Sequence, residues 1–175
     1  MWQLSTVGYE GASLGDFLAL LRHEGVEYLI DVRALPLSRR RGFSKSSLAT
    51  HLKNEGIQYM HLGSLGDPRP GREAARAGRY LEFRRIYLTH LATESAQRAL
   101  RLLASISAES SACLLCFERD AATCHRSLIA DALASSHGTH VKHLVIGSIK
   151  DGKSERPLGR TGRTGPGARQ GRSAA

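Results

Sequence analysis

Hydrophobic residues in this chain fall into short apolar runs, separated by stretches in which apolar positions recur at helical spacing. The apolar runs predict five strands, at residues 4–8, 26–32, 57–62, 112–117 and 141–146. The helical spacing predicts helices over residues 14–24, from residue 44 or 46 to 55, over 80–107 as one long or broken helix, and over 124–135.

Strands and helices in regular alternation indicate right-handed crossovers between parallel strands. The run ACLLCF at residues 112–117 has no polar alternation, which is typical of a strand covered on both faces of a sheet. We therefore expect an α/β fold: a single open, doubly wound, mostly parallel sheet of about five strands with helices on both faces.

Two segments depart from this pattern. Residues 63–79 are rich in glycine, proline and arginine, a composition that predicts a mobile basic loop. From residue 150 onward the chain has no aromatic residue and, alanine aside, a single aliphatic one, Leu158. We expect an ordered domain over 1–149 and a disordered basic Gly/Arg-rich tail over 150–175. Its Arg-Gly spacing resembles segments that track nucleic-acid backbones, although a solubilising tail without a partner has the same composition.

The charge balance narrows the class of partner. Among 175 residues, 25 lysines and arginines outweigh 16 acidic residues and give a net charge of +9. An excess of this size favours an anionic partner, either nucleic acid or a phosphate-containing small molecule.

Nothing in the sequence predicts a membrane or an export pathway. The longest apolar run, at residues 112–117, is far shorter than the roughly 20 residues of a membrane span. The N-terminus has no basic region followed by an apolar stretch, and three cysteines are an odd number for a disulfide framework. We expect a cytoplasmic protein with reduced thiols and no membrane partner.

Polar residues follow several of the predicted strands at the point where each strand ends. Tyr9 follows the first, Arg33 the second, His61 ends the third and Glu118 follows the fourth, while Cys124 begins the last predicted helix. Because ligand sites in parallel sheets lie beyond the carboxyl ends of the strands, these side chains are expected to meet at one edge.

Cys124, His125 and Arg126 combine three chemical capacities at one helix start. A thiol at a helix N-terminus beside imidazole and guanidinium has a lowered pKa and is nucleophilic as a thiolate. His125 is suited to proton transfer, and Arg126 together with the free backbone N–H groups is suited to holding an anion. Alternatively, Cys124 is a packed thiol, His125 caps carbonyls and Arg126 pairs with Glu118. Glu118, at a strand end among apolar residues, is the candidate acid or base, since such burial raises a carboxyl pKa.

The second strand leads into a basic segment. Arg33 can present its planar fork to a phosphate or carboxylate, or it can form an ion pair with Asp31 or Glu118. Arg39 is a further candidate anion-binding residue, and Ser38 a candidate substrate contact.

Three more side chains are candidate substrate contacts, Tyr9, Tyr59 and His61. The two tyrosines are suited to stacking on a base or ring, although an aromatic residue near a strand end is commonly part of the core edge.

Two other kinds of site are not expected. Cys116, Cys124, His125 and His61 include zinc-ligand types, but Cys-x7-Cys-His lacks the short paired spacing of zinc modules, so we predict no metal and no cofactor. The Cys-x5-Arg spacing over residues 113–119 matches that of a cysteine phosphatase loop. The intervening LLCFE is strand-like, however, and has no glycine to let backbone amides point inward, so we do not expect a phosphatase loop.

An ordered set of motifs supports a family assignment. They are Thr6-Val7-Gly8-Tyr9, Asp31-Val32-Arg33, Pro36, Ser38-Arg39, Phe43, Gly56-Ile57-Gln58-Tyr59, Leu65-Gly66, Leu114-Leu115-Cys116-Phe117-Glu118, Cys124-His125-Arg126 and Val141-Lys142-His143. Over about residues 4–147 the chain resembles the family called domain of unknown function 488. The resemblance implies an α/β fold but no established activity.

Function therefore rests on the residues. The first hypothesis is an enzyme, a hydrolase or lyase, that acts on a nucleotide or modified nucleic acid through an anion-binding pocket with Cys-His-Arg and Glu118. The second is a non-catalytic module that binds a nucleotide or nucleic acid with the same edge. The third, a thiol redox protein using Cys116 and Cys124, lacks a Cys-x-x-Cys motif. The sequence does not predict an oligomeric state.

Overall fold

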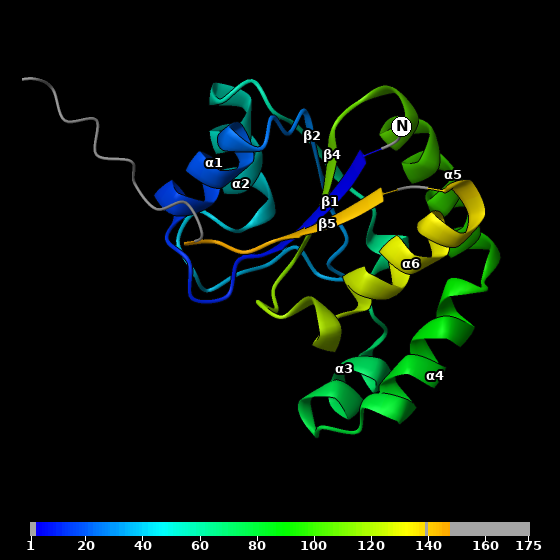
Figure 1. The fold of residues 1–175 in the computed structure, drawn as a ribbon. Helices are drawn as coiled ribbons and strands as arrows, with labels where there is room; N and C mark the ends of the chain where they lie inside the picture. Colours follow the sequence, from blue (N-terminus) through cyan, green and yellow to red (C-terminus); the bar gives the residue numbers. More distant parts are fainter. Residues whose placement is uncertain (1–2, 139, 148–175) are drawn as a thin grey trace, which may run out of the picture.

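The protein is built around a five-stranded sheet in which every strand pair is parallel (Figure 1). The computed structural model describes residues 3–138 and 140–147. The strands lie in the order β3-β2-β4-β1-β5. Their bounds are β1 Gln3–Gly8, β2 Tyr28–Asp31, β3 Gln58–His61, β4 Ala112–Cys116 and β5 His140–Leu144. The expected α/β fold with a parallel sheet is confirmed.

Helices cover both faces of the sheet, as the crossovers predict. The helices are α1 Leu14–His23, α2 Lys45–Asn54, α3 Arg69–Arg76, α4 Tyr80–Leu91, α5 Glu94–Glu109 and α6 His125–His137. Side chains of α1 and α2 pack on one face with Val7 and Leu115, and side chains of α3 to α6 pack on the other with Leu4 and Leu114. Adjacent residues of β1 and β4 thus alternate between two cores, which explains why neither strand has a face of solvent-exposed side chains.

Local signals fix where the first helices begin. Ser13 caps α1, because its side-chain oxygen accepts a hydrogen bond from the Asp16 backbone N–H at 3.1 Å. The second helix begins after Ser44, the first of the two starting points predicted.

The prediction of a mobile loop over residues 63–79 is wrong. This segment contains a 3-10 turn, Gly63–Leu65, and then α3. Proline in the first turn of α3 costs no helical hydrogen bond, and Ala74 is buried in the core that α3 shares with α4. Packing therefore orders a segment whose glycine and proline content is typical of a loop.

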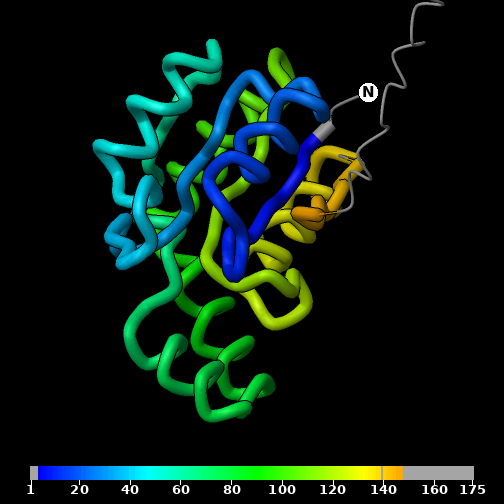
Figure 2. Tube along the Cα trace, turned by 90° about the vertical axis from the view of Figure 1, so that its left-hand side faces the viewer, coloured from blue at the N-terminus to red at the C-terminus, as the bar shows by residue number. Residues whose placement is uncertain are grey.

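The long predicted helix is broken into α4 and α5. The chain leaves the helix after Leu91 and restarts after Thr93, whose hydroxyl accepts a hydrogen bond from the Ala96 backbone N–H. Helices α3 and α4 lie together at one end of the molecule in both Figures 1 and 2.

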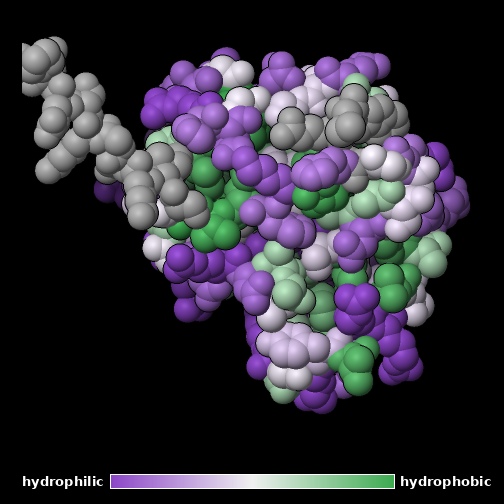
Figure 3. All heavy atoms as spheres, viewed as in Figure 1, coloured by the Kyte–Doolittle hydropathy of each residue, from purple (hydrophilic) through white to green (hydrophobic). Residues whose placement is uncertain are grey.

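The face drawn in Figure 3 carries mostly hydrophilic side chains with smaller apolar patches between them. Within the described residues no helix combines the length and apolar character needed to cross a membrane. The predicted tail at residues 150–175 lies outside the described residues.

Candidate functional site

A pocket opens beyond the carboxyl ends of β1 and β4. These adjacent strands lead to helices on opposite faces, α1 and α6, and such a divergence leaves a crevice at the strand ends. The pocket has a volume of about 910 Å³ and includes Glu118, Cys124 and His125 in its lining. A Cβ atom on Gly8, the last residue of β1, would lie only 1.7 Å from the Glu118 backbone oxygen, so this close approach of β1 to the segment after β4 requires glycine.

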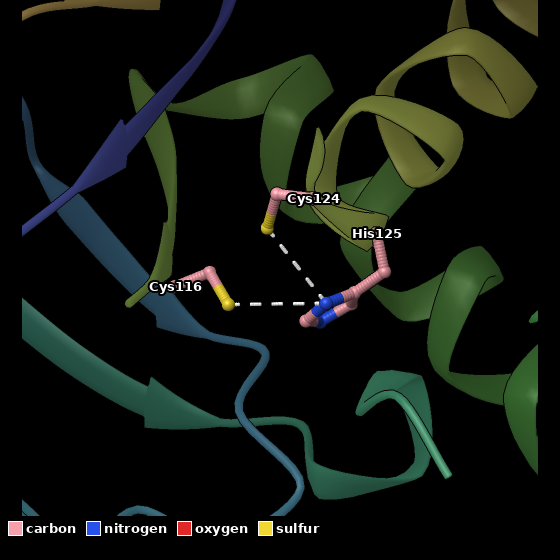
Figure 4. A group of neighbouring side chains, drawn as sticks. All are labelled: Cys116, Cys124 and His125. Carbon is pink, nitrogen blue, oxygen red and sulfur yellow. Dashed lines mark hydrogen bonds between the residues drawn. The ribbon is translucent and has the colours of Figure 1, made fainter. Parts of the chain in front are cut away.

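The chain after β4 folds back on itself and returns to the strand end. Cys116 is the last residue of β4, and a 3-10 turn, Ala121–Thr123, reverses the chain. The Asp120 carboxylate caps that turn by accepting a hydrogen bond from the Ala122 backbone N–H at 2.9 Å. Cys124 and His125, which begin α6, are thereby placed opposite Cys116 (Figure 4).

Four side chains meet there and form what we call the thiol cluster: Cys116, Glu118, Cys124 and His125. The Glu118 Oε2 atom lies 2.9 Å from the Cys116 sulfur and 3.1 Å from the Cys124 sulfur. Both sulfurs lie 3.8 Å from Nδ1 of His125. Figure 4 shows the two thiols and the imidazole pointing toward one another. The cluster contains groups able to act as acid, base, nucleophile or metal ligand.

The imidazole of His125 has a fixed orientation. Its Nε2 lies 2.9 Å from the Val32 backbone oxygen, which can only accept, so Nε2 carries a proton and donates it. The Tyr87 ring lies against it, with ring centroids 5.2 Å apart, and the Tyr87 hydroxyl donates to the Leu65 backbone oxygen at 2.7 Å. Nδ1 consequently faces the two sulfurs.

The side chains of the thiol cluster differ in how their pKa values are shifted. Burial opposes ionisation of Cys124, but the hydrogen bond from Cys116 and the charge of His125 together hold the Cys124 pKa well below its usual value. Burial lowers the pKa of His125, but the charge of Cys124 and the hydrogen bonds to Cys124 and to the Val32 backbone together outweigh burial and raise that pKa to about 9. The pair therefore favours thiolate and imidazolium.

The other two members hold their protons to higher pH. The hydrogen bond to Cys124, and then burial, raise the pKa of Cys116. Burial, and then the charge of Cys124, raise the pKa of Glu118. Cys113 is a contrast within the same strand: it is fully buried outside the cluster, and burial raises its pKa to about 12.

Arg126 lines the pocket, but its guanidinium donates to the protein. Its Nε and Nη2 donate to the Thr6 hydroxyl at 3.3 Å and to the Arg119 backbone oxygen at 2.9 Å, and Nη1 donates to the Glu118 backbone oxygen. The side chain is only 1% exposed. Arg126 thus ties β1 and α6 to the segment that carries Glu118.

Asp67, a carboxylate outside the thiol cluster, lines the same pocket and was not indicated by the sequence. It precedes α3 and is 5% exposed, and its Oδ1 has no hydrogen-bond partner within the described part of the chain. Burial raises its pKa to about 6. A Cβ atom on Gly71 would lie 2.1 Å from that Oδ1, so the glycine of α3 makes room for the carboxylate. The only sequence signal was an Asp-Pro step inside a segment interpreted as a loop.

Arg33 lies in a separate group, the Arg33 cluster, formed with Tyr9, Asp31 and Tyr59. Its Nε and Nη2 donate to the two Asp31 oxygens at 2.8 and 2.6 Å, and its Nη1 donates to the Tyr9 hydroxyl at 3.0 Å. The Tyr59 hydroxyl donates to Asp31 Oδ2 at 2.7 Å. None of these four residues lines the pocket. The structure therefore has the Arg33–Asp31 ion pair, one of the alternatives left open by the sequence.

The remaining sequence candidates also lie away from the pocket. His61 Nε2 donates to the Arg33 backbone oxygen at 2.9 Å. Ser38 accepts a hydrogen bond from the Arg40 backbone N–H at 3.1 Å, and Arg39 is exposed in the segment after β2. The arginines that line the pocket besides Arg126 are Arg72, Arg76 and Arg119.

Comparison with known proteins adds one finding. The model of the family described as "Domain of unknown function DUF488" matches residues 13–133, which is more than half of the chain. No curated protein and no solved structure matched the chain. The protein belongs to the DUF488 family.

Proposed function

We propose that the protein is an enzyme that hydrolyses a bond in a nucleotide or in modified nucleic acid, with Glu118, Cys124 and His125 at its catalytic centre. One observation carries this proposal: a carboxylate, two thiols and an imidazole converge within hydrogen-bonding range at a pocket of about 910 Å³. Buried proton-transfer groups that converge on a pocket are typical of catalytic centres.

Glu118 is the proton-transfer group in this proposal. Glu118 belongs to the pocket lining, and burial together with the charge of Cys124 raises its pKa toward the working range of a general acid or base. Cys124 and His125 complete the centre. Together they favour a Cys124 thiolate beside a His125 imidazolium, so the nucleophile in this proposal is the activated sulfur of Cys124.

The pocket rim supports an anionic, ring-bearing substrate. Arg76 and Arg119 are exposed, and within the described part of the chain no acceptor holds either guanidinium. The acidic Glu10 on the same rim accepts a hydrogen bond from the Arg119 backbone N–H. Tyr80 and Phe117, which are 46% and 42% exposed, place aromatic rings on the rim. Guanidinium and aromatic groups together suit phosphate and a stacked base.

The test is a substrate panel assayed with matched carboxylate variants. Nucleoside mono-, di- and triphosphates and short RNA and DNA strands with modified bases are incubated with the protein, and products are identified by mass spectrometry. We expect wild-type protein to consume one class, and Glu118→Gln to lower turnover about 10²- to 10⁴-fold with binding retained. Glu94→Gln, on an exposed helix start, is the control and retains full turnover. Binding without turnover by wild-type protein would establish the non-catalytic module instead, and neither binding nor turnover would overturn both.

A further inference from the structure

The three nitrogen and sulfur donors of the thiol cluster have the spacing of metal ligands. The two sulfurs and His125 Nδ1 all lie within 4.8 Å of one another, and each sulfur lies 3.8 Å from Nδ1. In tetrahedral zinc sites with Zn–S near 2.3 Å and Zn–N near 2.0–2.1 Å, sulfur and nitrogen ligands are about 3.6 Å apart. A single ion can therefore reach all three donors with small side-chain movements.

The hydrogen bond behind the imidazole supports the same conclusion. Metal-binding histidines commonly donate their second ring N–H to a carbonyl, which fixes the tautomer and aims the free nitrogen at the metal. His125 has this arrangement, because Nε2 donates to the Val32 backbone oxygen at 2.9 Å and Nδ1 faces the two sulfurs. The ring is 5% exposed, so its orientation is also held by packing.

The donor types point to a soft divalent cation. Glu118 Oε2 lies within 3.1 Å of both sulfurs, so a carboxylate oxygen lies beside the three donors. Cys116 and Cys124 are only 4% and 2% exposed, so the protein shields both sulfurs from solvent. Arg126 does not occupy the sulfurs, because its guanidinium nitrogens donate to Thr6 and to backbone oxygens. A pair of sulfurs with one imidazole is a soft donor set that suits zinc and does not suit magnesium or calcium.

We propose that Cys116, Cys124 and His125 bind one Zn²⁺ ion, with Glu118 beside its fourth position. The fourth position would open toward the pocket, because Glu118, Cys124 and His125 belong to the pocket lining whereas Cys116 does not. Three protein ligands with one open position are typical of catalytic zinc rather than structural zinc. Binding would release to solvent the proton of the Cys116 thiol and the proton shared by Cys124 and His125 Nδ1.

This inference deepens the proposed function, and its consequence for the reaction rests on that proposal. A water molecule in the fourth position would transfer a proton to Glu118. The resulting hydroxide would form a bond to the electrophilic atom of the substrate, and the leaving group would depart with its electron pair and take the proton from Glu118. Cys124 would then be a ligand, and the attacking atom would be the water oxygen.

Cobalt is a suitable probe, since Co²⁺ bound to thiolates absorbs in the near ultraviolet and tetrahedral Co²⁺ absorbs in the visible range. Full-length protein is treated with a chelator, transferred to metal-free buffer and titrated with Co²⁺ and then Zn²⁺. We expect saturation at one equivalent of Co²⁺, both absorption features, and loss of both on addition of one equivalent of Zn²⁺. Absence of a thiolate-to-cobalt band in the wild-type protein would overturn the proposal.

Matched cysteine variants separate this site from adventitious binding. Cys116→Ala is expected to weaken Co²⁺ binding at least about 100-fold, whereas Cys113→Ala removes a buried thiol of the same strand outside the cluster and leaves binding unchanged. Circular dichroism confirms that each variant is folded. If Cys116→Ala is misfolded, release of bound Zn²⁺ from wild-type protein by a thiol reagent decides the matter, and retention of zinc would contradict thiolate ligation. Equal Co²⁺ affinity in folded wild-type protein and Cys116→Ala would also overturn the proposal.

The two proposals fail in different ways. Zinc binding with no turnover of any substrate class would leave the metal site standing and overturn the hydrolase. Turnover that survives complete zinc removal but is lost in Glu118→Gln would leave the hydrolase standing and overturn the catalytic metal.

Discussion

Two buried polar clusters lie at the ends of neighbouring strands, and they differ in where their hydrogen bonds lead. At the end of β2, Arg33 and Asp31 form a bidentate ion pair, and Tyr9 and Tyr59 complete their hydrogen bonds. At the end of β4, the thiol cluster brings together groups that repel one another when ionised. The first cluster is closed within the protein, and the second opens on a pocket.

The packing around each cluster follows the same division. The Tyr9 ring stacks on Phe43 with centroids 4.4 Å apart, and it meets Phe117 edge to face. Protein atoms therefore cover the tyrosine that binds Arg33. By contrast, Asp67 contributes a further carboxylate to the pocket, and its Oδ1 lacks a partner within the described residues. A buried polar cluster with all its bonds made stabilises a fold, whereas one with unmet bonds and pocket access is suited to chemistry.

The largest expected effect is a loss of stability from the closed cluster. Asp31→Asn leaves the Arg33 guanidinium buried without its counter-charge, and we expect the free energy of unfolding to fall by about 3–5 kcal/mol. Urea unfolding at neutral pH measures it. Tyr59→Phe, which removes one hydrogen bond to the same carboxylate, is the graded control at about 1 kcal/mol. A loss below about 1 kcal/mol in Asp31→Asn would remove the distinction between the clusters.

Thiol reactivity should distinguish Cys124 in the thiol cluster from Cys113 in the core. In chelator-treated protein at neutral pH, we expect iodoacetamide to modify Cys124 at least about 100-fold faster than Cys113. The Cys124 pKa is lowered and the residue belongs to the pocket lining, whereas burial raises the Cys113 pKa to about 12. Peptide mass spectrometry against time gives both rates. Similar slow rates at the two positions would contradict an ionised Cys124.

The next effect concerns Asp67 and pH. Its pKa is about 6 in the folded protein, against an ordinary value of 3.8 for an aspartate, so the folded state binds the proton more tightly than the unfolded state does. This preference lowers stability as pH rises from about 4 to 6, and the loss is complete above that window. In metal-free protein, Asp67→Asn is expected to be more stable than wild type by about 1–2 kcal/mol at pH 7 and equal to it below pH 4. Thermal unfolding across that range measures both values, and parallel profiles for the two proteins would contradict the prediction.

The sequence predicts most of the thiol cluster because the cluster is local. Glu118, Cys124 and His125 lie within eight consecutive residues that start just after a strand, and the parallel sheet places that strand end at the ligand edge. The expectation of no zinc site on the same stretch rested on the absence of short paired spacing between the cysteines. The proposed zinc site rests instead on the 3-10 turn at Ala121–Thr123, which brings Cys124 back to Cys116 across a seven-residue gap.

Other parts of the site depend on packing and could not be predicted. Asp67 and Arg72 belong to a segment whose glycines and prolines favour a loop, and contact with α4 is what makes it helical. The role of Arg33 was open for a different reason. A guanidinium fork fits a phosphate and an aspartate equally well, and only the position of Asp31 beside it decides between them.

The smallest expected effect comes from the equivalent carboxylate-to-amide substitution in the thiol cluster. Glu118→Gln replaces a carboxylate by an amide, as Asp31→Asn does, but the main charge partner of the His125 imidazolium is Cys124 rather than this carboxylate. Burial and the charge of Cys124 raise the Glu118 pKa, so folding favours its carboxyl form over its carboxylate form relative to the unfolded chain. We therefore expect the free energy of unfolding to change by less than about 0.5 kcal/mol or to rise slightly, in the same urea experiment. A loss of unfolding free energy comparable with that of Asp31→Asn would mean that Glu118 stabilises the fold. The two clusters would then differ in their residues but would both be structural.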